Sequence, residues 1–148
     1  MGHSERAAKL FCEGYNCCQA VLVAFAEDCG ISEQTASLLA SSFGGGMGRL
    51  REVCGAVSAM FMVAGLLAGY TNDDPKEKKD EHYAFIQQLA KEFKDKHSTI
   101  ICRDLLGSLG KSTNPVSDAR TAEYYKVRPC VRFVITAAEI LDRHFFAE

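Results

Sequence analysis

Apolar positions recur at helical spacing along almost the whole chain. The clearest stripes are Ile86, Leu89, Ala90 and Phe93 in one segment and Val131, Val134, Ile135, Ala138 and Leu141 in another. No segment shows the sustained period-two alternation that indicates a strand. The spacing and the glycine stops predict helices over residues 4–14, 16–30, 32–43, 49–68, 74–97 and 99–106, and from 129 onward. Residues 107–120 are predicted to form the longest loop, with a short helix after it.

Several of the predicted helices begin with a capping residue. Ser4, Asn16 and Ser32 offer side-chain oxygens to the first free N–H groups. Asp74 does the same ahead of Pro75, which suits the first helical turn. These signals predict an all-α bundle of about six or seven helices in which residues 1–148 form a single helical domain.

Residues 53–70 form the most apolar run of the chain. These 18 residues carry no charge and reach the lower limit of length for a membrane span. Glycine and alanine dilute the hydrophobicity of the run and allow neighbouring helices to approach closely. We therefore expect a central, small-residue apolar helix inside the bundle and no stable membrane span.

The charge of the chain argues against nucleic acid as a partner. The net charge is −2, and basic residues do not gather into the cationic face that nucleic-acid binding requires. The N-terminal residues lack the uninterrupted apolar core of a secretory signal. The sequence thus predicts a cytoplasmic protein that does not bind nucleic acid.

Seven cysteines are a high number for a chain with no export signal. In a reducing compartment, cysteines serve as metal ligands, redox thiols or buried side chains. None of them forms a CxxC pair, so the fold must assemble any site from distant segments. Three stand at predicted helix starts, where free N–H groups favour the thiolate: Cys17, Cys54 and Cys130.

The remaining cysteines give weaker signals. Cys102 lies beside Arg103 in a short predicted helix, and Cys12, Cys18 and Cys29 have the pattern of packing or surface residues. Filling space in the core is the alternative role for every cysteine of the chain.

A loop with four glycines in five residues precedes Cys54. Such a loop brings the backbone close to a ligand and exposes successive N–H groups, which bind anions or the sulfurs of a cluster. We therefore predict cofactor contacts from Gly45, Gly46, Gly48 and Arg49. The loop lacks the Gly-Lys-Ser/Thr ending of a phosphate-binding P-loop. A plain tight connection between two packed helices is the alternative interpretation.

Four motifs occur in the order GYNCCQAV (14–21), GGGMGRLREVCGAVSA (44–59), CRDLLG (102–107) and PC (129–130). Together they resemble the family of putative redox-active proteins labelled C_GCAxxG_C_C, over residues 14–138. The resemblance implies that Cys17, Cys54, Cys102 and Cys130 are the key thiols. The chain departs from the label at two points. The label has the order Gly-Cys-Ala, whereas the chain has Cys54-Gly55-Ala56, and alanine stands at position 59 where the label has glycine.

Three functions remain open for these four cysteines. The favoured one is a redox-active protein whose thiolates bind an iron–sulfur cluster or a metal such as zinc. The second is a dithiol/disulfide oxidoreductase or sensor, for which four cysteines allow three pairings. The third is a non-catalytic helical binding module with cysteines in its core. The redox partner and the substrate are not indicated, and the apolar helix is also compatible with a homo-oligomer.

Overall fold

The computed structural model describes residues 1–147, and its regular structure in that range is helical apart from one isolated β-bridge. Six helices span eight residues or more: α1 (His3–Cys12), α2 (Cys17–Phe25), α3 (Glu33–Ala40), α5 (Gly55–Ala68), α6 (Lys76–His97) and α9 (Cys130–Phe145). The short ones are α4 (Gly44–Met47), α7 (Cys102–Leu106) and α8 (Ala122–Val127). The prediction of an all-α bundle is confirmed. The assignment of residues 1–148 to one domain stays a prediction.

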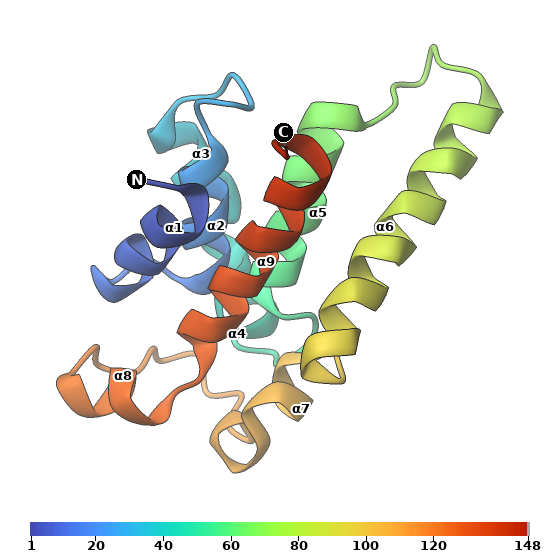
Figure 1. Cartoon of the computed structure of the whole chain (residues 1–148). Coiled ribbons are helices and arrows are strands. Elements are labelled where there is room, and N and C mark those ends of the chain that lie inside the picture. The colour runs from blue at the N-terminus through green and yellow to red at the C-terminus, as the bar shows by residue number, and fades with distance from the viewer. Residues whose placement is uncertain (148) are drawn as a thin grey trace.

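The apolar helix α5 lies at the centre of the bundle, as predicted. It packs against α2, α6 and α9, and α1 closes the opposite side of α2 and α9 (Figure 1). Small residues such as Ala56 and Ala59 are fully buried on α5, which lets its neighbours approach. Burial of apolar surface between α2, α5 and α9 is the main force that holds these helices together.

The helix predicted from residue 49 begins six residues later, at Gly55. Met47, Arg49 and Arg51 have positive φ angles of 68°, 66° and 64°, which no α-helix accommodates. The glycine-rich loop therefore extends through Arg51, and Cys54 is the N-cap of α5 rather than a residue of its first turns.

The predicted caps are right in two cases and wrong in two. Asn16 accepts a hydrogen bond from the N–H of Gln19 and forms a full capping box, and Ser32 accepts one from Thr35. By contrast, Gly2 is the N-cap of α1, so Ser4 lies inside the helix. Asp74 accepts a hydrogen bond from the N–H of Thr71 instead of capping α6.

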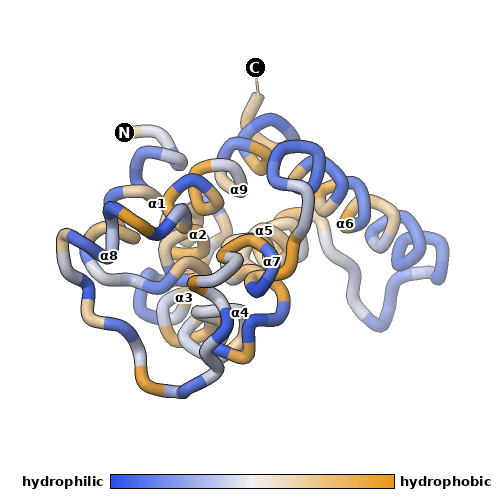
Figure 2. Tube along the Cα trace, turned by 90° about the horizontal axis from the view of Figure 1, so that it is seen from below, coloured by the Kyte–Doolittle hydropathy of each residue, from blue (hydrophilic) through white to orange (hydrophobic). Residues whose placement is uncertain are grey.

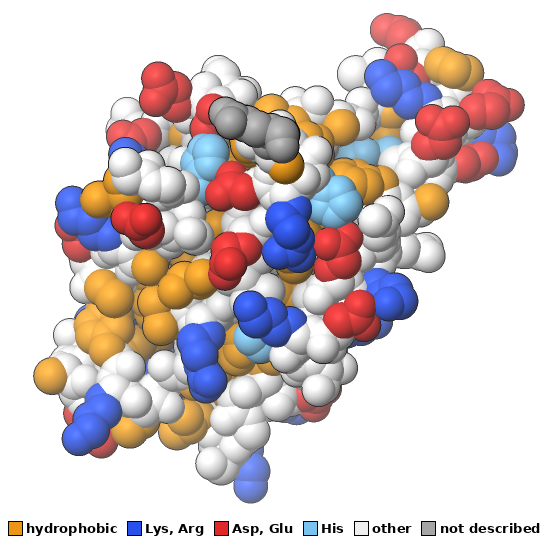
Figure 3. Space-filling view, viewed as in Figure 1, with side chains coloured by type: hydrophobic (Ala, Val, Ile, Leu, Met, Phe, Trp, Pro, Cys, Tyr) orange, Lys and Arg blue, Asp and Glu red, His pale blue; other side chains and the backbone are white. Residues whose placement is uncertain are grey.

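Helix α6 is attached to the bundle mainly through its C-terminal half. Its buried residues are Leu89 and Phe93, while the N-terminal half projects outward and carries acidic and basic side chains in mixture (Figures 1 and 3). Nε2 of His97, near the C-terminal end of α6, lies 2.8 Å from Oγ1 of the buried Thr136 on α9. The helix therefore uses His97 to dock on α9.

Figure 2 views the bundle from the end at which α4, α7 and α8 lie. Hydrophobic residues follow α2 and α5, whereas much of α6 is hydrophilic. Among the described residues, no helix combines the length and the hydropathy that crossing a membrane requires. The end of the bundle seen in Figure 2 is where the N-termini of α2, α5, α7 and α9 gather.

Candidate functional site

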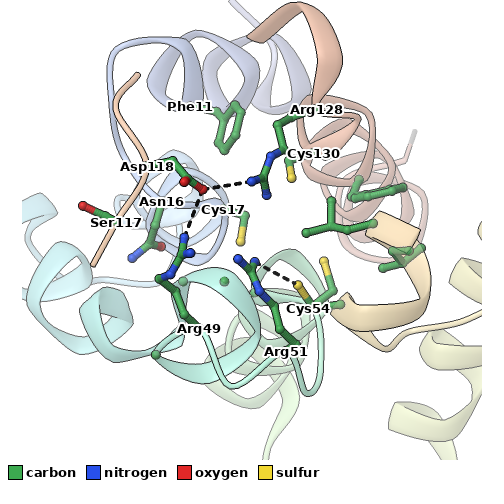
Figure 4. A pocket seen from close by; sticks show the side chains of 18 of the residues that line it. Phe11, Asn16, Cys17, Arg49, Arg51, Cys54, Ser117, Asp118, Arg128 and Cys130 are labelled. Atoms are coloured by element: carbon green, nitrogen blue, oxygen red, sulfur yellow. Dashed lines mark hydrogen bonds and ion pairs between the residues drawn. The ribbon is translucent and has the colours of Figure 1, made fainter. Parts of the chain in front are cut away.

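The four cysteines singled out in the sequence line one cavity of about 270 Å³ (Figure 4). Each of them begins a helix: Cys17 is the first residue of α2, Cys54 the N-cap of α5, Cys102 the first residue of α7 and Cys130 the first residue of α9. The other cysteines, Cys12, Cys18 and Cys29, do not line the cavity. The fold thus assembles a four-thiol site from distant segments of the chain.

The glycine-rich loop forms one wall of this cavity. Gly45, Gly46 and Gly48 have positive φ angles of 66°, 74° and 60°, a conformation that glycine adopts at little cost. The N–H groups of Arg51 and Glu52 bond back to the carbonyls of Gly45 and Gly46 at 3.2 and 2.9 Å. The chain thereby folds over on itself and directs the side chain of Arg51 inward.

Three of the four residues predicted to contact a cofactor line the cavity, and one does not. Gly45, Gly48 and Arg49 line the cavity. Gly46 does not; a Cβ atom at this glycine would stand 2.7 Å from the Cβ of Cys102. Gly46 therefore allows the start of α7 to approach the loop, and a cofactor contact from any of the four stays a prediction.

Hydrogen bonds between residues 51–54 and 100–103 hold two of the cysteine-bearing segments side by side. The N–H of Cys54 donates to the carbonyl of Ile100 at 2.8 Å. The N–H of Cys102 donates to the carbonyl of Glu52 at 2.6 Å. The segments carrying Cys54 and Cys102 are therefore fixed relative to each other by the backbone.

Cys17 has the most easily ionised thiol of the four. Its sulfur accepts hydrogen bonds from the thiol of Cys54 and from the N–H groups of Gly45, Gly55 and Cys18. These donors outweigh the effect of burial and lower the pKa of Cys17 from 9.0 to about 6. The sulfur also lies at the N-termini of α2 and α5, whose dipoles favour negative charge. Cys17 is therefore mainly a thiolate at neutral pH.

Gly55 makes room for this thiolate. A Cβ atom at position 55 would lie 2.5 Å from Sγ of Cys17 and 2.8 Å from the carbonyl oxygen of Phe43. Only a residue without a side chain lets the first N–H of α5 reach the sulfur. The glycine next to Cys54 is thus required for the close approach of α5 to α2.

The other three thiols of the cavity hold their protons. The thiol of Cys54 donates a hydrogen bond to the sulfur of Cys17, and this bond and burial together raise the pKa of Cys54 well above 9.0. Burial also raises the pKa of Cys102. Burial and the nearby charge of Cys17 raise the pKa of Cys130 to about 12. The cavity therefore contains one thiolate among three thiols at neutral pH.

Arg51 is the largest fully buried side chain of the described chain and is only 2% exposed. Its guanidinium group points into the cavity toward Cys17 (Figure 4). Nε donates to the carbonyl of Ser112 at 2.9 Å, and Nη1 lies 3.8 Å from Sγ of Cys102. Nη2 is buried and has no hydrogen-bond partner.

Asp118 is the only carboxylate among the described residues that line the cavity. Its Oδ2 accepts hydrogen bonds from Arg49 Nη1 at 3.1 Å and from Arg128 Nη2 at 2.9 Å. The bond from Arg49 is the main cause that lowers the pKa of Asp118. The carboxylate thus links the glycine-rich loop to the segment that enters α9.

Residues 111–121, which we call the strap, cover one side of the cavity. Pro115, Ser117 and Asp118 of the strap line it. Arg120 anchors the strap by donating to the carbonyl oxygens of Phe11 and Tyr15, both at 3.0 Å. The strap is therefore tied to the chain on both sides of the turn between α1 and α2.

Sequence reasoning missed three charged residues of this site: Asp118, Arg120 and Arg128. Arg51 was indicated only by its place next to the glycine-rich loop and Cys54. The strap has no apolar periodicity, so nothing in its sequence indicated that it covers a cavity.

We compared the sequence with models of known protein families. The profile of the family described as "Putative redox-active protein (C_GCAxxG_C_C)" matches residues 15–144. The chain belongs to this family. All four cysteines of the C_GCAxxG_C_C pattern and the whole glycine-rich loop lie within the matched range. A search of curated proteins and a search of solved structures returned no match.

The arrangement also bears on metal binding by this C_GCAxxG_C_C protein. Within residues 1–147, no three or more His, Cys, Asp or Glu side chains are grouped as the ligands of one metal ion. The four thiols, in this conformation, do not form a ready site for a single zinc ion. As a donor set, however, four cysteines around one cavity suit an iron–sulfur cluster, which is held by thiolates and stabilised by nearby N–H groups.

Proposed function

We propose that this protein is a thiol–disulfide redox protein in which Cys17 is the attacking thiolate and Cys54 the resolving thiol. One observation carries the proposal: the sulfur of Cys17 lies at the starts of α2 and α5 and accepts a hydrogen bond from the thiol of Cys54. The thiolate is the nucleophile of disulfide exchange, and the pKa of Cys17, about 6, leaves it ionised at neutral pH.

The reaction follows from this pairing. The thiolate of Cys17 attacks one sulfur of a substrate disulfide, whose S–S bond breaks as the other sulfur leaves as a thiolate. Cys54 then loses its proton and attacks Sγ of Cys17, which releases the second substrate thiolate and forms a Cys17–Cys54 disulfide. Two electrons pass from the protein to the substrate, and the reverse sequence oxidises a dithiol.

Cys102 and Cys130 supply two further thiols in the same cavity. Because burial raises the pKa of both, they are protonated at neutral pH and do not compete with Cys17 as nucleophiles. In this proposal they form a second dithiol that acts only after the Cys17–Cys54 disulfide has formed: one of them loses its proton and attacks that disulfide, the pair is oxidised to a Cys102–Cys130 disulfide, and Cys17 and Cys54 return to thiols.

An anaerobic redox titration tests the proposal. The protein is equilibrated with thiol buffers across a range of potentials, and mass spectrometry maps the disulfides at each potential. We expect a two-electron transition that joins Cys17 to Cys54 and is lost in Cys17→Ser and Cys54→Ser. Cys29→Ser, which alters a cysteine outside the cavity, should leave the transition unchanged. Failure of Cys17 and Cys54 to pair at any potential would overturn the proposal.

The convergence of all four cysteines on one cavity favours a second candidate function, the binding of an iron–sulfur cluster. Cys17, Cys54, Cys102 and Cys130 would hold it, and Arg51 would offset its negative charge. A bound cluster would supply one-electron transfer.

Analysis of iron, zinc and acid-labile sulfide in anaerobically purified protein tests this candidate. Iron with sulfide that is lost in Cys130→Ser but kept in Cys29→Ser would support the cluster. If the protein contains no metal and cannot form the Cys17–Cys54 disulfide, the non-catalytic binding module is the remaining function. The cytoplasmic location, the redox partner and a homo-oligomer stay predictions.

A further inference from the structure

The cavity around Cys17 is lined by an excess of positive charge. Its charged side chains are Arg49, Arg51, Arg120, Arg128 and Asp118. Even with Cys17 ionised, the positive groups outnumber the negative ones. A cavity lined mainly by one sign of charge concentrates ligands of the opposite sign.

Most of these guanidinium groups are already occupied by the protein. Arg120 is bound to two carbonyl oxygens, and Arg49 and Arg128 share the carboxylate of Asp118. Among the arginines that line the cavity, Arg51 alone has a buried nitrogen without a partner, Nη2. A buried guanidinium N–H without an acceptor has lost its hydrogen bonds to water and has no protein acceptor to replace them, which costs free energy. The position next to Nη2 therefore suits an oxyanion.

An anion bound to Arg51 would lie close to the thiols of the cavity. Nη1 of Arg51 lies 3.8 Å from the sulfur of Cys102, and the same cavity contains Cys17. Figure 4 shows the guanidinium group directed toward Cys17. A ligand whose oxyanion group binds Nη2 thus places its remaining atoms among the thiols.

We infer that the substrate of the proposed dithiol is a low-molecular-weight disulfide that carries a carboxylate or another oxyanion group. Arg51 binds the anionic group, and the thiolate of Cys17 attacks the nearer sulfur. The inference rests on the proposed function for the redox step and on Arg51 for the choice of substrate.

Atoms and electrons balance in this step. A bond forms between Sγ of Cys17 and the nearer substrate sulfur, the substrate S–S bond breaks, and the distal half leaves as a thiolate. Cys54 gives up its proton and displaces the bound half by forming the Cys17–Cys54 bond. The disulfide is reduced to two thiols, and the protein dithiol is oxidised.

The size of the cavity agrees with a small substrate. Its volume is about 270 Å³. The strap, tied by Arg120 and Asp118, covers one side of it. A cavity of this size, partly covered by the strap, suits a small disulfide.

Three disulfides of similar size test the inference: anionic dithiodiglycolate, neutral bis(hydroxyethyl) disulfide and cationic cystamine. We expect dithiodiglycolate to oxidise the Cys17–Cys54 pair about tenfold faster than the neutral compound, and cystamine to be slowest. Arg51→Gln should remove most of this preference. Arg103→Gln, which removes an exposed arginine outside the cavity, should retain it. Equal rates for the three disulfides would overturn the inference.

Alkylation tests anion binding separately from the proposed redox function, because a single thiol reacts with the reagent and no disulfide has to form. Iodoacetate is anionic and iodoacetamide neutral, so the ratio of their rates at one thiol reports anion binding independently of that thiol's pKa. The ratio should be about tenfold higher at Cys17 than at the exposed Cys12 and should fall when sulfate is added. A raised ratio in protein that forms no disulfide would retain the anion site and reject only the redox function. Equal ratios would reject the anion site. If Arg51→Gln does not fold, the sulfate competition on the wild type decides: a ratio at Cys17 that sulfate leaves unchanged would reject the anion site.

Discussion

The thiol of Cys54 donates a hydrogen bond to the sulfur of Cys17, although the two residues begin different helices. The pair exists because α5 starts against α2 with a glycine, Gly55, at the point of contact. The bond separates the acidities of the two cysteines, since it stabilises the thiolate of Cys17 and holds the proton on Cys54.

Replacement of Cys54 tests whether this bond sets the acidity of Cys17. Cys54→Ala removes the largest cause of the lowered pKa, so the pKa of Cys17 should rise from about 6 toward 9.0. A hydrogen bond to a charged group corresponds to a shift of about one to two units. Cys54→Ser keeps a donor and should retain most of the shift. The pH dependence of Cys17 alkylation by iodoacetamide measures both values; an unchanged pKa in Cys54→Ala would contradict the assignment.

Stability should depend on pH through these thiols. Because the pKa of Cys17 is about 6 in the folded protein and 9.0 when unperturbed, its contribution is complete above pH 9 and disappears as the pH falls to 6. The pKa of Cys130 is raised to about 12, so its contribution is present below pH 9 and is lost toward pH 12. Under reducing conditions the contribution of the thiols to stability should therefore peak near pH 9.

Urea unfolding between pH 6 and pH 9 measures the rising side of this profile. The slope from Cys17 is at most about 1.4 kcal/mol per pH unit and should be absent in Cys17→Ser. Cys12→Ser, at an exposed position outside the cavity, is the control that should keep it. Identical slopes in the wild type and Cys17→Ser would show that the thiolate is not formed on folding.

Two glycines of α5 offer a matched pair of substitutions. Gly55→Ala would place a methyl group 2.5 Å from the sulfur of Cys17, so we expect slower alkylation of Cys17 and a loss of about 1–3 kcal/mol in stability. A Cβ atom at Gly65 meets nothing within 4 Å. Gly65→Ala should therefore stabilise the helix by about 0.5–1 kcal/mol and leave Cys17 unchanged. Alkylation kinetics and urea unfolding measure both effects, and equal behaviour of the two variants would argue against close packing at Gly55.

Local signals in the sequence predicted much of the framework. Asn16 and Gln19 form a capping box from residues three positions apart, and the uncharged run that contains Ala56 and Ala59 marks the central helix. Such features depend on neighbours along the chain, which a sequence displays directly. The same signals put Cys17 at a helix start, where the structure has it.

The cavity itself depends on contacts that no local pattern encodes. Asp118 meets Arg49 across 69 positions, and Arg120 meets Phe11 across 109. Arg51 was expected in a helix, yet it takes a positive φ because its N–H bonds to Gly45 and its carbonyl accepts from Arg103. Tertiary hydrogen bonds offset a backbone conformation that is unfavourable for arginine.

The anchor of the strap should contribute measurably to stability. Arg120→Met removes two hydrogen bonds to carbonyl oxygens, so we expect a loss of about 1–3 kcal/mol and faster proteolytic cleavage within residues 111–121. Arg103→Met, at an exposed site, should change stability by less than about 0.5 kcal/mol. Thermal unfolding and limited proteolysis compare the two variants. An unaltered cleavage rate in Arg120→Met would mean that other contacts hold the strap.

Asp118 competes with an incoming anion for the arginines of the cavity. Its carboxylate occupies Arg49 and Arg128, so Asp118→Asn keeps the shape of the side chain and frees positive charge beside Arg51. We expect oxidation of the Cys17–Cys54 pair by dithiodiglycolate to become about three- to tenfold faster, because local positive charge raises the concentration of an anion. The rate with bis(hydroxyethyl) disulfide should stay the same, since this compound has no charge to attract. An equal rise with both disulfides would indicate that Asp118→Asn merely loosens the strap, and a fall with dithiodiglycolate would show that Asp118 positions the arginines that bind it.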